Sequence, residues 1–180
     1  MRKILFVLGE LHDADLQWMT DAGSVQDVAD GEVLIEEGTP NKRLYIVIDG
    51  TLSVRHRARE GAETSRMGIG EMAGEISMLD SRPSTATLVA DGPAQVFVLE
   101  HSDLLTKMER DTSFAAHFYR AVALFLANRL QQALTLESGS GGSPLAADAQ
   151  DEEELSPEVM DSVSLSGARF LAFLGRLGNS

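Results

Sequence analysis

The fold is decided by residues 70–88, which read GEMAGEISMLDSRPSTATL. The pattern predicts a strand end, a tight turn, one short helix, a loop and the start of another strand. Gly70 and Gly74 allow backbone conformations that other residues avoid. The short helix is expected from Ile76, with its first N–H groups able to face an anion. Glu75 stands at the turn, where its carboxylate can accept hydrogen bonds from hydroxyl groups. This stretch therefore has the chemistry of a cradle for one sugar-phosphate.

The composition limits the class of protein. The 180 residues fit one domain with appendages, and the absence of cysteine excludes disulfides and suits a reducing cytoplasm. The 28 acidic residues outnumber the 15 basic ones, and a formal charge of −13 repels phosphate backbones and anionic lipid. The apolar opening from Ile4 to Leu8 is too short for a signal-peptide core or a membrane span. We expect a cytoplasmic protein that binds neither nucleic acid nor membranes directly.

Short strands separated by turn residues fill about residues 25–100. The strand signals are at 33–35, 44–48, 51–54, 87–90 and 95–99. Asp49-Gly50 is read as a hairpin turn between two of these strands, and Glu60-Gly61 as the tip of another hairpin. This spacing predicts a sandwich or barrel of the jelly-roll type, with about eight strands.

Helical patterns flank the strand region. A helix is expected over about residues 10–22, with Trp18 packed against the next layer and Gly23 as its stop. A short helix is expected from Asp103 to about Glu109, with Ser102 as its N-cap.

A longer helix is expected from Phe114 to about Leu136, capped by Thr112 or Ser113. Its apolar stripe has two interpretations: it packs on the sheet domain, or it pairs with the same helix of a second subunit to form a homodimer. The stripe consists of Phe114, Phe118, Ala121, Phe125 and Leu126.

The predicted organisation has five parts. These are an N-terminal helical segment (1–24), a β-roll (25–100), C-terminal helices (101–137), a flexible acidic linker (138–154) and a short C-terminal helix (155–180). The last segment carries an apolar stripe and is expected to dock on its own domain or on a partner subunit. The stripe consists of Phe170, Phe173, Leu174 and Leu177.

Residues from about 25 to 135 resemble the cyclic-nucleotide-binding domains, the family of the bacterial catabolite activator and the protein kinase A regulatory subunit. The resemblance rests on the cassette at 70–88, on the stretches 31–38 and 44–50, and on an ordered set of turn glycines. The glycines are Gly31, Gly38, Gly50, Gly70 and Gly74. It implies a mainly β fold, a β-roll with an N-terminal helix and C-terminal helices. The helix-turn-helix domain of the family's transcription factors is not visible after the long helix.

The resemblance also implies a ligand site. A cyclic nucleotide such as cyclic AMP would lie against Gly74-Glu75-Ile76-Ser77 and Ser84-Thr85-Ala86. Glu75 would bind the ribose 2′-hydroxyl, and the N–H groups of Ile76 and Ser77 would face the cyclic phosphate. In the long helix, Asn128 and Arg129 are candidates for capping the base.

One position departs from the family pattern. Cassettes that bind cyclic nucleotides usually carry Arg at the place of Ser84, where the Arg pairs with the phosphate. Such a charge-assisted pair contributes on the order of 1.5–3 kcal/mol. Arg82 lies two residues earlier and would either reach the phosphate from another direction or remain an exposed loop residue.

Two functions from different classes follow. The first is a cytoplasmic sensor that binds a cyclic nucleotide and signals through helix movement to a protein partner. The alternative is a degenerate, ligand-free β-roll that acts as a protein-interaction scaffold. Enzymatic activity, a cofactor and a metal site are not expected, because the histidines are scattered and no nucleophile motif is present. The histidines are His12, His56, His101 and His117.

Overall fold

The computed structural model describes residues 10–57, 63–138, 173, 175 and 177. The predictions for the apolar opening, for the Glu60-Gly61 hairpin tip, for the linker from residue 139 on, and for Phe170 and Leu174 lie outside these residues.

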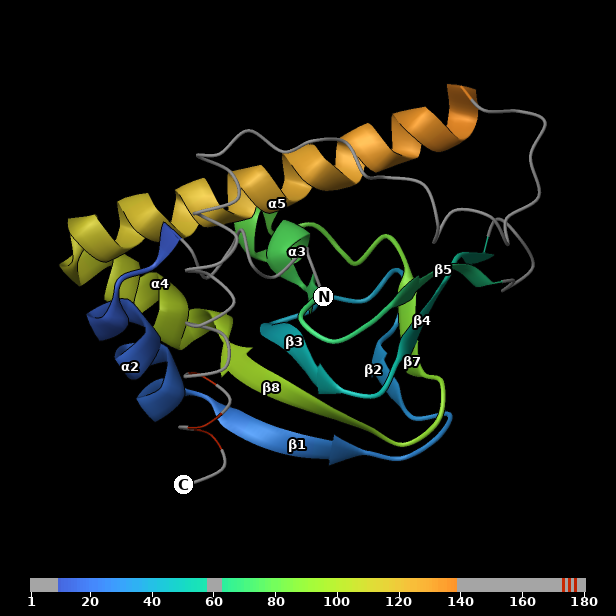
Figure 1. Cartoon of the computed structure of the whole chain (residues 1–180), viewed down its shortest axis with the longest axis horizontal. Helices are drawn as coiled ribbons and strands as arrows, with labels where there is room; N and C mark the ends of the chain where they lie inside the picture. Colours follow the sequence, from blue (N-terminus) through green and yellow to red (C-terminus); the bar gives the residue numbers. More distant parts are fainter. Residues whose placement is uncertain (1–9, 58–62, 139–172, 174, 176, 178–180) are drawn as a thin grey trace.

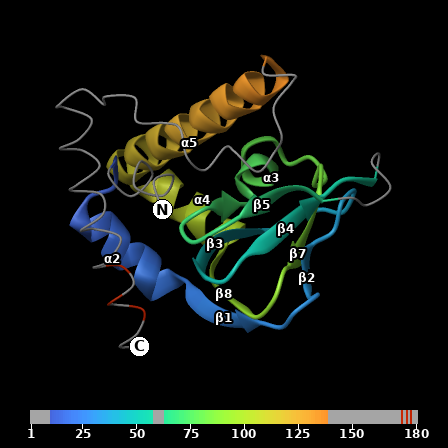
Figure 2. The same cartoon turned by 45° about the vertical axis from the view of Figure 1, so that its right-hand side comes forward.

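Two four-stranded antiparallel sheets face each other, and helices gather at one end and along one side (Figure 1 and Figure 2). The first sheet has the order β1-β8-β3-β6 and the second β2-β7-β4-β5. The strands are β1 (Ser24–Val28), β2 (Val33–Ile35), β3 (Arg43–Asp49), β4 (Leu52–Arg55), β5 (Glu63–Met67), β6 (Met72–Ala73), β7 (Thr87–Ala90) and β8 (Ala94–Glu100). The helices are α2 (Asp13–Ala22), α3 (Glu75–Asp80), α4 (His101–Arg110) and α5 (Thr112–Ser138). The predicted mainly β roll with flanking helices is confirmed.

The turn glycines of the sequence pattern adopt the backbone conformation that glycine favours. Gly31, Gly38, Gly50, Gly70 and Gly74 have φ between 76° and 93°. The hairpin predicted at Asp49-Gly50 is nevertheless wrong. β3 pairs with β6 and β8, whereas β4 pairs with β5 and β7, so this turn carries the chain from one sheet to the other.

The central strands of the first sheet are buried on both faces. In β3, Leu44 and Ile46 join an apolar cluster with the helices, while Tyr45 and Val47 join a second cluster between the two sheets. β8 does the same, with Phe97 directed to the helical cluster. Burial on both faces explains why these strands read as nearly continuous apolar runs.

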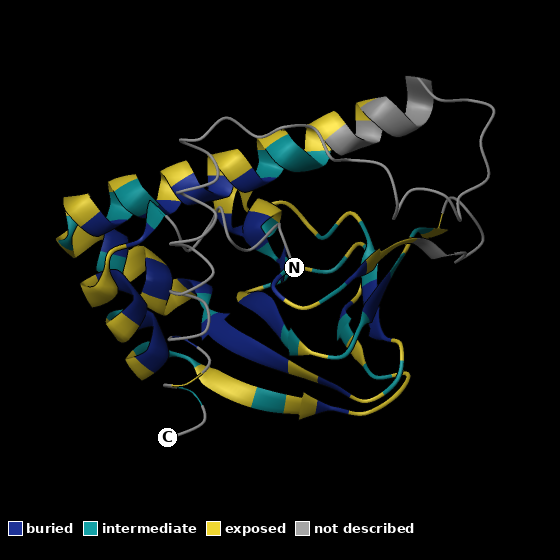
Figure 3. Ribbon diagram, in the orientation of Figure 1, coloured by how far each residue is buried: buried dark blue, intermediate teal, exposed yellow. Residues whose placement is uncertain are grey.

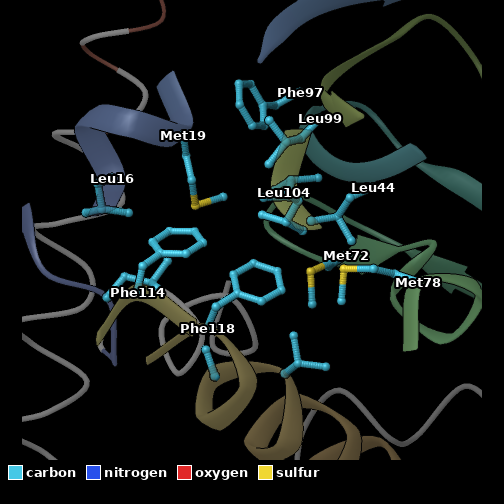
Figure 4. Packing of buried hydrophobic residues seen from close by; sticks show 14 of the residues in the cluster. Leu16, Met19, Leu44, Met72, Met78, Phe97, Leu99, Leu104, Phe114 and Phe118 are labelled. Atoms are coloured by element: carbon cyan, nitrogen blue, oxygen red, sulfur yellow. The ribbon is translucent and has the colours of Figure 1, made fainter. Parts of the chain in front are cut away.

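The aromatic face of α5 belongs to the helical cluster. Phe114 and Phe118 lie beside Leu16 and Met19 of α2 (Figure 4), and the Trp18 ring meets the Phe114 ring edge-on at 5.1 Å. Phe125 is also buried within its own chain. The first interpretation of the stripe is therefore confirmed, and its use as a dimer interface is wrong.

The predicted N-caps differ from those in the structure. α4 begins at His101, so Ser102 lies inside its first turn rather than before it. At the start of α5, Asp111 Oδ1 accepts a hydrogen bond from the Phe114 N–H at 3.0 Å, the role expected of Thr112 or Ser113. Asp111 is fixed by Lys107 Nζ at 2.8 Å, and this hydrogen bond lowers the pKa of the Asp111 carboxyl.

The C-terminal segment docks on its own domain at Phe173. This side chain is fully buried, and its ring meets that of Phe97 at 5.1 Å with an interplanar angle of 82°. Leu177 packs against the same cluster. The predicted docking is thus confirmed at these two positions.

Replacing Phe173 by alanine tests how much this contact contributes to the free energy of unfolding. We expect Phe173→Ala to lower the free energy of unfolding by about 3 kcal/mol, since it removes a fully buried ring from a packed cluster. Leu105→Ala, at an exposed position of α4, is the control and should have little effect. Urea denaturation measures both, and equal stabilities for Phe173→Ala and wild type would contradict the docking.

Candidate functional site

The helix of the cassette follows directly after β6, at a glycine that no other residue can replace without distortion. Gly74 has φ 93° and stands directly before α3, which starts at Glu75, one residue earlier than predicted. A Cβ on Gly74 would collide with the backbone oxygen of Arg43 and lie 2.7 Å from Asn41 Nδ2. The same Asn41 nitrogen donates a hydrogen bond to the Arg43 oxygen at 2.7 Å, so this part of the backbone is fixed. The glycine lets α3 start tight against β3.

The other side of the cassette is held by the turn after β2. The Ser84 N–H donates to the Thr39 oxygen at 2.9 Å, and the Gly38 N–H donates to the Ser84 oxygen at 2.8 Å. The Glu37 N–H donates to Thr87 Oγ1 at 3.1 Å. These bonds bring the loop end back opposite the start of α3.

A cavity of about 90 Å³ lies between these two sides. Eight of the ten predicted site residues line it: Gly74, Glu75, Ile76, Ser77, Ser84, Thr85, Ala86 and Arg129. The first N–H groups of α3 have no acceptor within a helix that begins at Glu75. The cavity therefore combines helix N–H groups, hydroxyls and one guanidinium.

The remaining two predicted residues do not line the cavity. Arg82 has a side chain that is 80% exposed, and its Nε pairs with Asp80 Oδ2 at 2.6 Å, which agrees with the interpretation as an exposed loop residue. Asn128 lies on α5 next to Arg129 without being part of the lining. The sequence interpretation missed the apolar walls, which consist of Ile35, Val54, Met67, Ala73, Pro83 and Leu88, together with Thr87. The strand pattern places the apolar wall residues in or near strands but does not show which of them face a ligand.

Arg129 enters the site from α5, which lies across α3 (Figure 1). Its Nη1 donates to Glu75 Oε1 at 2.9 Å, and its guanidinium lies 5.3 Å from the centre of the Phe125 ring. Glu75 is only 1% exposed. Burial raises the pKa of the Glu75 carboxyl, and the positive charge of Arg129 opposes that rise. The long helix thus supplies the counter-ion of the cassette carboxylate.

Ser84 stands where the family pattern has Arg. Its hydroxyl oxygen is buried and has no hydrogen-bond partner among the described residues. A buried hydroxyl without a partner is unusual in folded proteins, and a ligand oxygen in the adjoining cavity would satisfy it. Within the described ranges, Arg129 is the one cationic side chain that lines the cavity.

The structure brings together two histidines that the sequence interpretation regarded as scattered. The rings of His12 and His117 meet edge-on at 4.2 Å, and His117 Nδ1 lies 3.0 Å from Asp15 Oδ2. Across the residues placed by the structure, no group of three His, Cys, Asp or Glu side chains could hold a metal ion. In the same residues, no helix is both long and apolar enough to pass through a bilayer.

Comparison with known proteins identifies the class. Residues 25–111 match the family described as the cyclic nucleotide-binding domain. Its members are typically regulatory, non-catalytic modules.

Two curated relatives carry the match in larger proteins. A cGMP-dependent protein kinase, egl-4, of Caenorhabditis briggsae is 34% identical over 100 residues, which cover 53% of this chain and 13% of the kinase. Cyclic GMP-binding protein C of Dictyostelium discoideum is 26% identical over 171 residues, which cover 93% of this chain and 6% of that protein. The chain therefore spans only a small part of either relative.

Solved structures share the fold. A cyclic nucleotide-binding domain from Methylobacillus flagellatus superposes with a TM-score of 0.66 at 20% identity, covering 72% of this chain and 78% of that one. The N-terminal domain of a transcriptional regulator from Streptomyces coelicolor has a TM-score of 0.57 at 29% identity, with coverage of 71% and 94%.

The close approach at Gly74 leads to a prediction with an internal control. Gly74→Ala and Gly92→Ala both place a side chain at φ near 90°, but a Cβ at Gly92 meets nothing within 4 Å. We expect Gly92→Ala to lower the free energy of unfolding by about 1–2 kcal/mol, because of the backbone conformation alone. Gly74→Ala should lower the free energy of unfolding by about 2 kcal/mol more, because its Cβ overlaps fixed backbone. Chemical denaturation compares them, and equal losses would contradict the packing described for the cassette.

Proposed function

We propose that the cavity binds a cyclic nucleotide and that Arg129 supplies the positive charge that the cassette lacks at Ser84. The observation that carries the proposal is the contact between Arg129 Nη1 and Glu75 Oε1 at 2.9 Å. This contact supports the proposal because it would hold the guanidinium beside the N–H groups of α3, where the phosphate of a cyclic nucleotide would lie.

Arg129 has donors left for a ligand. A guanidinium carries five N–H donors, and the bond to Glu75 uses one of them. Planar guanidinium groups pair with phosphate oxygens through two parallel bonds, which makes Arg suited to this task. In this arrangement Glu75 accepts from the ribose 2′-hydroxyl, and the N–H groups of Ile76 and Ser77 face the phosphate.

Cyclic GMP is the first ligand to test. Both curated relatives described above are named for cyclic GMP. The β-roll fold alone does not determine which ligand is bound, because a protein named as cAMP-independent has the same fold. This protein is a regulatory subunit of a cAMP-independent protein kinase A from Trypanosoma brucei, with a TM-score of 0.51.

Binding would be passed on through α5. A ligand that pairs with Arg129 changes the contact between α5 and the cassette, and thereby favours one position of the helix over another. We propose that this shift alters a contact with a protein partner, and that the protein works in the cytoplasm, where a chain without cysteine needs no oxidising environment.

A second function is favoured by the same pair of residues. Glu75 already has its counter-ion, and Ser84 provides no charge for a phosphate. In that case the Glu75–Arg129 pair is structural, and the β-roll serves as a ligand-free scaffold for a protein partner.

Calorimetric titration with cyclic GMP and cyclic AMP separates the two functions. A sensor binds one of them, and both Arg129→Ala and Glu75→Ala should weaken binding at least about tenfold, since each removes a charge-assisted bond. Ser84→Arg should tighten binding by about tenfold or more, because it restores the phosphate pair. Arg82→Ala is the matched control and should bind like wild type, because Arg82 does not line the cavity. A scaffold would show no heat with either nucleotide, in wild type or in Ser84→Arg.

A further inference from the structure

A second hollow, of about 310 Å³, lies on the outer face of the second sheet. Side chains alternate between the two faces of a strand, and Ile35 and Leu88 belong to the cluster between the sheets. Val33 and Val89, which are paired across β2 and β7, line the hollow on the other face. The helical cluster packs on the first sheet, and the second sheet keeps a mixture of buried and exposed residues (Figure 3). The hollow is therefore accessible from solvent.

The charge of this hollow is opposite to that of the whole chain. Three of its seven lining residues are Arg55, His56 and Arg57, and none of the described residues that line it is Asp or Glu. The chain as a whole has a formal charge of −13. A basic hollow on an acidic protein attracts anions, whereas most of the remaining surface repels them.

Arg55 is held in place with most of its donors unused. Its Nε donates to Ser53 Oγ at 3.2 Å, and Ser53 is fully buried. Among the side chains that the structure describes, no carboxylate pairs with this guanidinium. A guanidinium has five N–H donors in a planar fork that fits phosphate oxygens. The donors on the two Nη atoms of Arg55 therefore remain for a ligand.

Arg57 adds a second guanidinium at the rim of the hollow. Its Nη2 pairs with Glu36 Oε1 at 3.1 Å, but the two side chains are 64% and 61% exposed. Exposed pairs of this kind contribute little to stability, so a phosphate can replace the carboxylate at a small cost in free energy.

Hydrogen bonds fix the rim to the strands and loops beside it. The Arg57 N–H donates to Glu37 Oε2 at 2.7 Å, and the Glu37 N–H donates to Thr87 Oγ1 at 3.1 Å. His56 Nδ1 lies 2.9 Å from the carbonyl oxygen of Thr85. A rim that is ordered before the ligand arrives loses little conformational entropy when the ligand binds.

We propose that this hollow binds an organic phosphate, with its phosphate on Arg55 and Arg57 and its apolar part on Val33 and Val89. Val33 is 53% exposed and provides apolar surface that such a ligand would cover. Two neighbouring guanidiniums suit a phosphate better than a carboxylate, because a phosphate offers three acceptor oxygens and more charge. This inference does not rest on the proposed cyclic nucleotide, because the hollow and the cassette cavity share no basic residue.

NMR titration of the whole chain with phenyl phosphate tests the site, because this probe joins one phosphate to an apolar ring. We expect the amide signals of residues 55–57 and 87–89 to shift and to reach saturation. Arg55→Gln should weaken binding at least about tenfold, because it removes the guanidinium whose donors are unused. A wild type without saturable shifts, or an unchanged affinity in Arg55→Gln, would overturn the proposal.

Two control variants separate this hollow from other basic positions. Arg66→Gln removes an arginine of β5 that pairs with Asp91 at 3.3 Å and does not line the hollow, so it should bind the probe like wild type. Arg129→Ala changes only the cassette cavity and should also bind like wild type. An equal loss in Arg66→Gln and Arg55→Gln would show nonspecific attraction by positive charge and overturn the proposal. Shifts confined to residues 74–77 and 84–86 would place the phosphate in the cassette cavity and overturn it as well, without contradicting the proposed binding of a cyclic nucleotide.

Discussion

The buried carboxylate of Glu75 is the constraint around which the candidate site is arranged. A carboxylate that is almost wholly removed from water needs a counter-ion close by, or it takes up a proton and becomes neutral. Here the counter-ion is Arg129, which is 54 residues away in the sequence and enters from a different element. The electrostatics of the cassette therefore depend on the position of α5. A change at either residue of the Glu75–Arg129 contact alters the environment of the other residue.

α5 can hold Arg129 in place because its other contacts are strong. Phe114, Phe118 and Phe125 anchor the helix in the apolar cluster that also contains Phe97 and Phe173. That cluster rests on the outer side of β3 and β8, while the second cluster fills the space between the sheets. Core packing thus places a guanidinium at the edge of a cavity whose other walls come from α3 and the cassette loop. The same helix also exposes Leu130 and Leu134 to solvent, so α5 contributes to the core, to the candidate site and to the surface.

The sequence predicted the parts of this structure that depend on local chemistry. The turn glycines, most strand positions and the cassette follow from backbone freedom and apolar patterning, and eight of ten predicted site residues line the cavity. It could not predict what depends on distant contacts. Asp49-Gly50 has the composition of a hairpin turn, but the pairing of β4 with β7 decides that the chain changes sheets there. α5 is apolar on both faces, so its pattern alone does not show that the aromatic face is inside. The bond from Arg129 to Glu75 is visible only once the helix has been placed.

A double-mutant cycle on Glu75 and Arg129 measures whether α5 and the cassette are energetically linked. The free energies of unfolding of wild type, Glu75→Met, Arg129→Met and the double variant are measured in urea at neutral pH without ligand. If the two side chains form a real link between α5 and the cassette, the coupling energy should be about 1 kcal/mol or more, as for other contacting pairs. The effects of the two single substitutions would then not add. A coupling energy near zero would contradict the account, because α5 and the cassette would then be energetically independent at this contact.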